Sequence, residues 1–119
     1  MRMFDQANGR FYTGTVDSNS VTAPGNCADV TIVADQDRIN TCDFLDSNTF
    51  TLLPMALSEQ YGGLIDWKIL LLYSLSHFGQ TVTAAGKTWD GFNLVPVPTS
   101  NANGISWEFT GQMVESMLS

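Results

Sequence analysis

Charge is scarce in this chain of 119 residues: charged residues make up 14% of it, well below the usual share of about a quarter. Basic residues are the scarcest, with five against twelve acidic ones and a net charge of -7. They are dispersed along the sequence as Arg2, Arg10, Arg38, Lys68 and Lys87. Nucleic acids and anionic membrane surfaces are both bound through clustered cations. We therefore expect no direct binding of nucleic acid and no docking on a membrane.

Long apolar runs and targeting signals are missing too. The most apolar segment, Leu64–Leu75, is interrupted by Asp66 and Lys68, and it falls short of the roughly 20 apolar residues that a membrane-spanning helix needs. The first residues lead into a polar stretch and not into the apolar region of a secretory signal. The sequence predicts a soluble protein of cytoplasmic origin, with a virion as an alternative destination.

Cysteine and histidine are too few for most metal sites. Cys27 and Cys42 are 15 positions apart and His77 is the single histidine, so we expect no zinc site and no cofactor. In a chain of cytoplasmic origin the cysteines are expected to be two free, partly buried thiols. His77 stands at the polar end of the apolar segment, where a histidine can cover the last carbonyl groups of a helix.

Two short motifs resemble binding loops but lack essential positions. Gly86-Lys87-Thr88 matches the end of a phosphate-binding loop, yet Thr81 stands where the loop needs a glycine. An exposed lysine leading into a hairpin is the simpler interpretation. Asp35-Gln36-Asp37 begins like a calcium loop, but Asn40 replaces the glycine at loop position six and Asp46 the glutamate at position twelve. We therefore predict no catalytic or metal-ligating residues.

Turn-forming dipeptides are plentiful. Asn8-Gly9, Asp90-Gly91 and Asn103-Gly104 each predict a β-hairpin, because these pairs readily adopt the positive φ angles of two-residue turns. Alternating or β-prone residues predict further strands at Val30–Asp35, at Phe50–Leu53 and at Ile105–Thr110.

The segment Leu64–Phe78 fits two structures. As a strand it has a period of two, whereas its length, its leucine content and the bracketing glycines at 62, 63 and 79 favour a helix. Short helices at 54–61 and 113–118 are also expected. The sequence thus predicts one α+β domain over residues 1–119, with a small antiparallel sheet or partly open barrel of four to six short strands packed on one main buried helix, Leu64–Phe78.

Low charge and abundant Ser, Thr, Asn and Gly suggest surfaces that other protein covers. Our leading hypothesis is a non-enzymatic protein-interaction or self-assembly module, such as a small structural subunit of virion type, that binds a different protein or forms a homo-oligomer. Two alternatives are an acidic decoy that inhibits a nucleic-acid-binding protein, and a small ligand-binding or enzymatic domain with a pocket between helix and sheet. The residues expected to contact a partner are Asp35, Asp37, Asp43, Asp46, Trp89 and Trp107.

Overall fold

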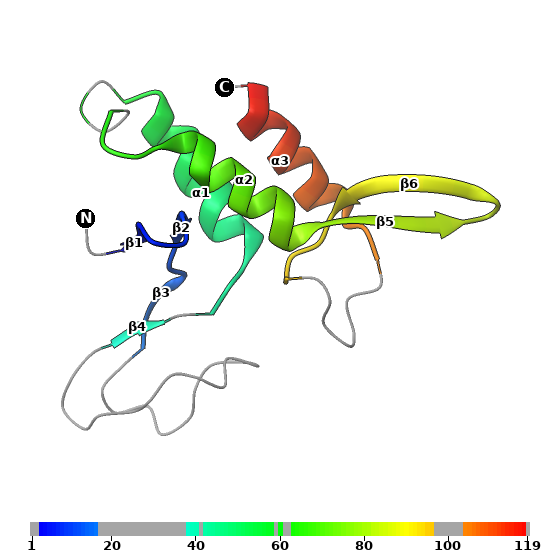
Figure 1. Ribbon diagram of the computed structural model, residues 1–119, viewed down its shortest axis with the longest axis horizontal. Helices are drawn as coiled ribbons and strands as arrows, with labels where there is room; N and C mark the ends of the chain where they lie inside the picture. The colour runs from blue at the N-terminus through cyan, green and yellow to red at the C-terminus, as the bar shows by residue number, and fades with distance from the viewer. Residues whose placement is uncertain are drawn as a thin grey trace.

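The computed structural model describes residues 3–16, 38–40, 42–58, 60, 63–96 and 104–118 (Figure 1). Its elements are β1 (Phe4–Asp5), β2 (Arg10–Phe11), β3 (Gly14–Val16), β4 (Arg38–Asn40), α1 (Leu45–Ala56), α2 (Trp67–Phe78), β5 (Gly79–Ala84), β6 (Lys87–Phe92) and α3 (Trp107–Leu118). The strands pair as three separate antiparallel ribbons, β1 with β2, β3 with β4 and β5 with β6. The α+β class is confirmed. In place of one sheet on one helix, the described residues form three ribbons and three helices.

Helix α2 confirms the helical interpretation of the central segment. It begins at Trp67 because the Asp66 side chain caps it, accepting hydrogen bonds from the backbone N–H groups of Lys68 (3.0 Å) and Ile69 (3.4 Å). It ends before Gly79, as the sequence predicted. Its fully buried residues form a narrow stripe: Leu70, Ser74 and Phe78. The expectation of one main buried helix over Leu64–Phe78 is therefore matched only in part: the helix starts three residues later than predicted, and its residues outside the stripe are exposed or half-buried.

Helix α1 replaces the strand predicted at Phe50–Leu53. The helix contains Pro54 two residues before its end at Ala56, where a missing N–H removes only one hydrogen bond of the last turn. Two threonine hydroxyls inside the helix bond to carbonyls four residues earlier, Thr49 to Leu45 (3.3 Å) and Thr51 to Ser47 (2.7 Å). The β-prone threonines are thus accommodated within the helix, and the predicted helix at 54–61 corresponds only to its end.

In the part of the chain that the structure describes, the core consists of two apolar clusters that α1 connects. The first contains Phe11, Leu52, Ile65 and Leu70. The second contains Leu45, Phe78, Phe92 and Met113. Residues of α1 enter both clusters, and α1 contacts α2 as well as α3. The central helix of the fold is therefore α1, and not the more apolar α2.

The hairpin of β5 and β6 turns at a different place from the predicted Asp90-Gly91. Its two turn residues are Ala85 (φ 50°) and Gly86 (φ 73°), and two positive φ angles define a type I′ turn. Asp90 and Gly91 lie inside β6, opposite Thr81 and Gln80. A side chain at Gly91 would collide with Ile105 and would lie 2.8 Å from the Thr110 hydroxyl. This glycine therefore allows close packing against the start of α3, and does not form a turn.

The turn at Asn8-Gly9 is confirmed, although it comprises the four residues 6–9 between β1 and β2. The strand predicted at Ile105–Thr110 is wrong, because α3 already begins at Trp107. Residue 103 and the predicted strand at Val30–Asp35 lie outside the described residues.

The expectation of free thiols is wrong for Cys42, which is buried and disulfide-bonded, while Cys27 lies outside the described residues. No helix in the described ranges is long and apolar enough to cross a membrane.

Ala85 occupies a left-handed conformation that costs a non-glycine residue about 1–2 kcal/mol. Asn tolerates this conformation better than other side chains and is preferred at the first position of a type I′ turn. Ala85→Asn is therefore expected to raise the free energy of unfolding by about 0.5–1 kcal/mol, measured by urea denaturation. Ala84→Asn, one residue earlier in β5, is the control and should give no gain. Equal stability of the two variants would contradict the turn assignment.

Candidate functional site

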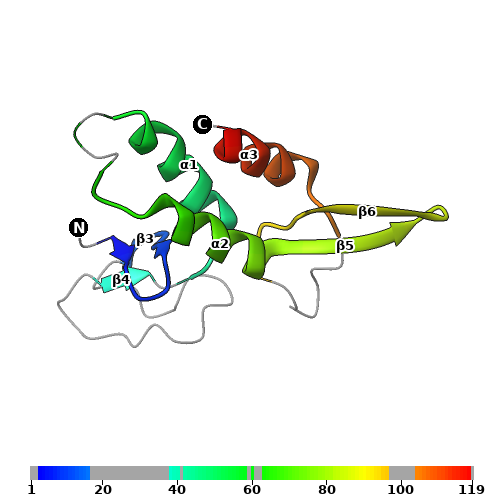
Figure 2. The same ribbon diagram turned by 45° about the horizontal axis from the view of Figure 1, so that its top comes forward.

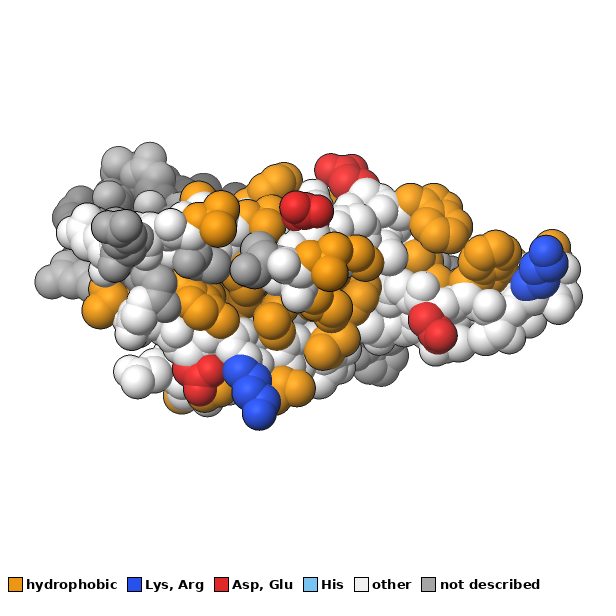
Figure 3. Space-filling model, turned by 90° about the horizontal axis from the view of Figure 1, so that it is seen from above, with side chains coloured by type: hydrophobic (Ala, Val, Ile, Leu, Met, Phe, Trp, Pro, Cys, Tyr) orange, Lys and Arg blue, Asp and Glu red, His pale blue; other side chains and the backbone are white. Residues whose placement is uncertain are grey.

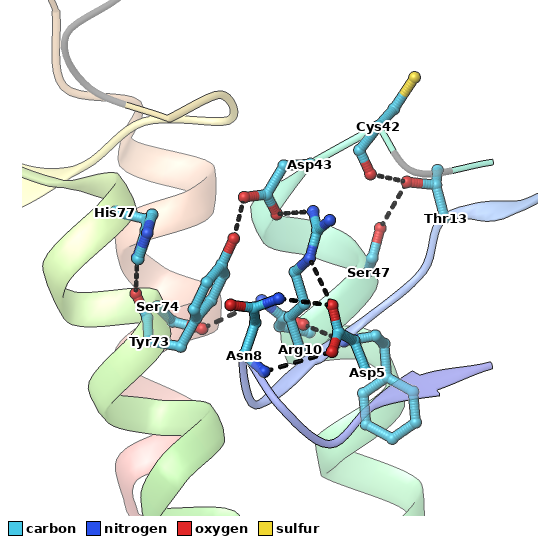
Figure 4. A network of polar contacts seen from close by, with 12 residues as sticks. Asp5, Asn8, Arg10, Thr13, Cys42, Asp43, Ser47, Tyr73, Ser74 and His77 are labelled. Atoms are coloured by element: carbon cyan, nitrogen blue, oxygen red, sulfur yellow. Dashed lines mark hydrogen bonds and ion pairs between the residues drawn. The ribbon is translucent and has the colours of Figure 1, made fainter. Parts of the chain in front are cut away.

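A polar network joins the N-terminal hairpin to two helices (Figure 4). Arg10 of β2 lies between two carboxylates, 3.7 Å from Oδ2 of Asp5 and 3.5 Å from Oδ1 of Asp43. Asp43 directly precedes α1, and its Oδ2 accepts a hydrogen bond from the hydroxyl of Tyr73 in α2. Asn8 also donates to Oδ2 of Asp5 (2.8 Å). The four elements β1, β2, α1 and α2 are thereby held together at one point.

The protonation states of Asp5 and Tyr73 suit a structural role for this network. The side-chain hydrogen bond from Asn8 holds the pKa of Asp5 below its ordinary value, so this carboxylate stays ionised. Burial, together with the hydrogen bond to Asp43, raises the pKa of Tyr73 above its ordinary value, so the hydroxyl remains a donor. The ionised Asp5 and the protonated Tyr73 therefore keep their roles as acceptor and donor at neutral pH.

Tyr73→Phe should lower the free energy of unfolding at pH 7 by about 1–3 kcal/mol, because it removes the donor to a half-buried carboxylate. A tyrosine pKa that folding raises stabilises the fold fully below the ordinary value of 10.0, and this contribution is lost as the pH rises toward the folded pKa. The variant should therefore lose less stability than the unaltered chain above pH 10. Urea denaturation across this range measures the difference, and identical alkaline slopes would contradict it.

The predicted acidic residues do not form one exposed array in the described part of the chain. The carboxylate of Asp43 is engaged by Arg10 and Tyr73, and Asp46 lies half-buried in the first turn of α1. Asp35 and Asp37 lie outside the described residues. No cluster of three or more potential metal ligands occurs among the described residues. The sequence did not indicate the network itself, because the first hairpin with Asp5 and Arg10, the segment with Asp43 and the helix with Tyr73 are three parts of the chain that only the fold brings together.

His77 lies where the sequence placed it, at the end of α2. Its Nδ1 is 2.9 Å from the carbonyl oxygen of Tyr73, and the two rings stack with centroids 3.9 Å apart. A small cavity of about 130 Å³ lies between the first turn and the start of α2. Its lining residues are Phe4, Gln6, Leu64, Ile65, Asp66 and Ile69. Because His77 does not line this cavity, the geometry brings no acid–base pair to it.

The two predicted tryptophans do come together. Trp89 of β6 and Trp107 of α3 meet edge to face, with ring centroids 5.9 Å apart and an interplanar angle of 86°. The contact exists because β6 and α3 are joined just below it: the N–H of Ser106 donates to the carbonyl of Phe92 (2.9 Å), and the N–H of Phe92 donates to the Thr110 hydroxyl (3.0 Å). Both rings remain exposed, at 42% and 70%.

Exposed apolar side chains extend well beyond the tryptophan pair. Figure 3 shows hydrophobic side chains gathered over the helices and the hairpin, with few charges among them. Each helix exposes such residues at helical spacing: Phe50 and Leu57 on α1 and just after it, Ile69, Leu72 and Leu75 on α2, and Trp107, Val114, Met117 and Leu118 on α3. We call this set, with Trp89, the outer apolar surface. The helical spacing of the apolar residues in α3 can be read from the sequence. The alternation of apolar and polar residues at 105–110 indicated a strand instead.

Comparison with known proteins supplies no further information. No protein-family model matches this chain, and neither a curated protein nor a solved structure does. The function must therefore come from the chemistry of the polar network and of the outer apolar surface.

Proposed function

We propose that this protein is a non-enzymatic protein-interaction or self-assembly module that uses its outer apolar surface. One observation carries the proposal. Among the described residues, twelve large hydrophobic side chains are exposed, whereas only nine hydrophobic side chains are buried. Scattered exposed apolar residues are common on monomers, but large continuous patches mark sites that another protein covers. A structural subunit of an assembly is the class of protein that this balance fits best.

The composition of the surface supports a protein partner. Tryptophan is enriched where interfaces carry most of their binding energy, and the paired Trp89 and Trp107 are the largest exposed side chains on it. Along α3, Val114 and Leu118 continue the surface from Trp107 at a spacing of seven and four residues. Such a stripe is the face that a helix normally buries.

Sedimentation velocity of the full chain at increasing micromolar concentration tests the proposal. We expect a mass above the 13.0 kDa of one chain. The double variant Val114→Asn, Leu118→Asn should dissociate at least tenfold more readily, a loss of about 1.4 kcal/mol or more. Glu115→Gln, on the same helix but off the apolar stripe, is the matched control and should associate like the unaltered chain.

The apolar dye ANS provides a second measurement. A monomer that binds ANS would show an accessible surface without self-association, and would favour a heterologous partner. A strict monomer that binds no ANS would contradict the proposed function, because the apolar side chains would then be covered within one chain.

A further inference from the structure

The hairpin of β5 and β6 projects away from the helices in both ribbon views (Figure 2). It is joined to the rest of the fold at its base, where β5 contacts α2 and β6 contacts α3. Toward the turn, Thr81, Thr83 and all residues from Ala84 to Asp90 are exposed. A lone two-stranded ribbon is marginally stable in water. A projecting hairpin of this kind gains stability when further strands pair with it.

The backbone of β5 presents unused hydrogen-bonding groups on its outer edge. With a two-residue turn, Ala84 and Lys87 form the first hydrogen-bonded pair, and the pairs then alternate along the ladder. The N–H and C=O groups of Val82 therefore face β6, whereas those of Thr81 and Thr83 face outward. Phe92 of β6 belongs to the same outward-facing set, and its N–H and C=O do bond outside the hairpin. Within the described ranges, the backbone groups of Thr81 and Thr83 have no such partner.

The side chains of β5 do not protect this edge. Natural proteins guard open edge strands with charged residues, proline or bulges. The sequence of β5 is Gly79-Gln-Thr-Val-Thr-Ala84, which has neither charge nor proline and is rich in β-prone residues. The edge of β6, in contrast, carries Lys87 and Asp90 and is occupied near its end by the bridge from Phe92 to Ser106. The edge available for strand addition is therefore that of β5.

We propose that β5 pairs antiparallel with β5 of a second copy of this chain, around a two-fold axis at Val82. In this register Thr81 faces Thr83 of the second copy, and the outward N–H and C=O groups form four hydrogen bonds. The two hairpins become one four-stranded sheet in the order β6-β5-β5-β6. This inference rests on the proposed function, since it names one partner and one contact of the assembly.

Two features favour a second copy of this chain as the partner of β5: the strand carries no charge, and its Val82 face also carries Trp89. A chain with a net charge of -7 repels itself, so a contact between copies is favourable only where like charges do not meet. The neutral β5 strand provides such a contact. Val82 and Trp89 lie opposite each other on one face of the hairpin, the face on which Trp89 meets Trp107. The combined sheet therefore places Val82 and Trp89 of both copies on one face, next to the Trp107 side chains.

Proline substitutions on the two edges of the hairpin give a matched test. Thr83 and Thr88 are opposite each other at a position whose backbone groups face outward on both strands, so proline at either removes no backbone hydrogen bond of the hairpin. Both substitutions remove the same side-chain hydrogen bond, between the hydroxyls of Thr83 and Thr88 (3.5 Å), so the pair stays matched. Thr83→Pro should raise the dissociation constant measured by sedimentation at least tenfold. Thr88→Pro should leave it unchanged. Circular dichroism of the helices checks that both variants fold.

A charge exchange at Val82 tests the two-fold register. Val82→Lys and Val82→Glu chains each place like charges opposite each other and should stay monomeric, whereas an equimolar mixture should associate again because opposite charges then meet. A mixture no better than its components would overturn the register. Association of Thr83→Pro equal to that of the unaltered chain would overturn β5 pairing, and so would a strictly monomeric unaltered chain.

These outcomes separate the inference from the proposed function. If Thr83→Pro associates normally while the Val114→Asn, Leu118→Asn variant does not, assembly uses α3 and β5 pairing is wrong. If the unaltered chain is monomeric yet binds ANS, β5 pairing is wrong and an interaction module with a different partner remains. If it is monomeric and binds no ANS, both are wrong.

Discussion

Phe78→Ala is expected to lower the free energy of unfolding by about 3–5 kcal/mol, the usual cost of emptying a buried aromatic site. Phe78 is 0% exposed and belongs to the cluster in which α1, α2, β6 and α3 meet. Alanine would leave a cavity there that three helices line, and their hydrogen-bonded backbones limit how far the site can collapse. Urea denaturation followed by circular dichroism measures the loss.

Phe50→Ala is the matched control, because it removes the same side chain from a position that is 58% exposed. We expect a change within about 0.5 kcal/mol under conditions where the chain is monomeric. A loss comparable to that of Phe78→Ala would show that Phe50 is buried within one chain, and would weaken the proposed function. A small loss would mean that the exposed phenylalanine does little for the fold of the monomer.

Asn48→Ala should lower the free energy of unfolding by about 2–4 kcal/mol, although the residue is polar. Asn48 is fully buried in α1. Its Oδ1 accepts from the backbone N–H of Phe11 (2.8 Å), and its Nδ2 donates to the hydroxyl of Ser74 (3.3 Å). Alanine would leave both buried partners without this bond, and an unmade buried hydrogen bond costs more than a made one contributes.

Thr51→Ala provides the comparison for Asn48→Ala. The Thr51 hydroxyl bonds only to the carbonyl of Ser47 within the same helix, so its loss should cost less than about 1 kcal/mol. Equal losses in the two variants would contradict the role of Asn48 as the polar connection between β2, α1 and α2. Hydrogen exchange at the Phe11 amide should also accelerate in Asn48→Ala and stay unchanged in Thr51→Ala.

The predictions that were right depend on neighbouring residues. Gly79 follows the last residue of α2, and His77 bonds to the carbonyl four positions earlier in that helix. The turn at Gly9 uses its own positive φ of 70°. In each case the interacting groups lie within one turn of chain, so the sequence alone contains the full arrangement.

The predictions that were wrong concern elements with weak or competing local patterns. Phe50–Leu53 is β-prone, yet Leu52 reaches the core as part of a helix. At Ile105–Thr110 apolar and polar residues alternate over six positions, which indicated a strand. The twelve residues of α3 also carry apolar side chains at helical spacing, and the helix is the structure that forms. At the second hairpin the Asp-Gly signal was misleading, because Gly91 makes room for Ile105 while the turn uses Ala85 at an energetic cost. Packing energy gained far along the chain exceeded each of these local preferences.

By itself, the sequence determined the α+β class, the end of α2 before Gly79 and the turn of the first hairpin. Only the tertiary structure decided that α1 is the central helix, that Asp43 is engaged by Arg10 and Tyr73, and that Trp89 meets Trp107. The reason is physical: caps and turns act between residues within one turn of each other. The ion pair of Arg10 with Asp43 and the contact between the two tryptophans depend instead on segments that folding brings together from distant parts of the chain.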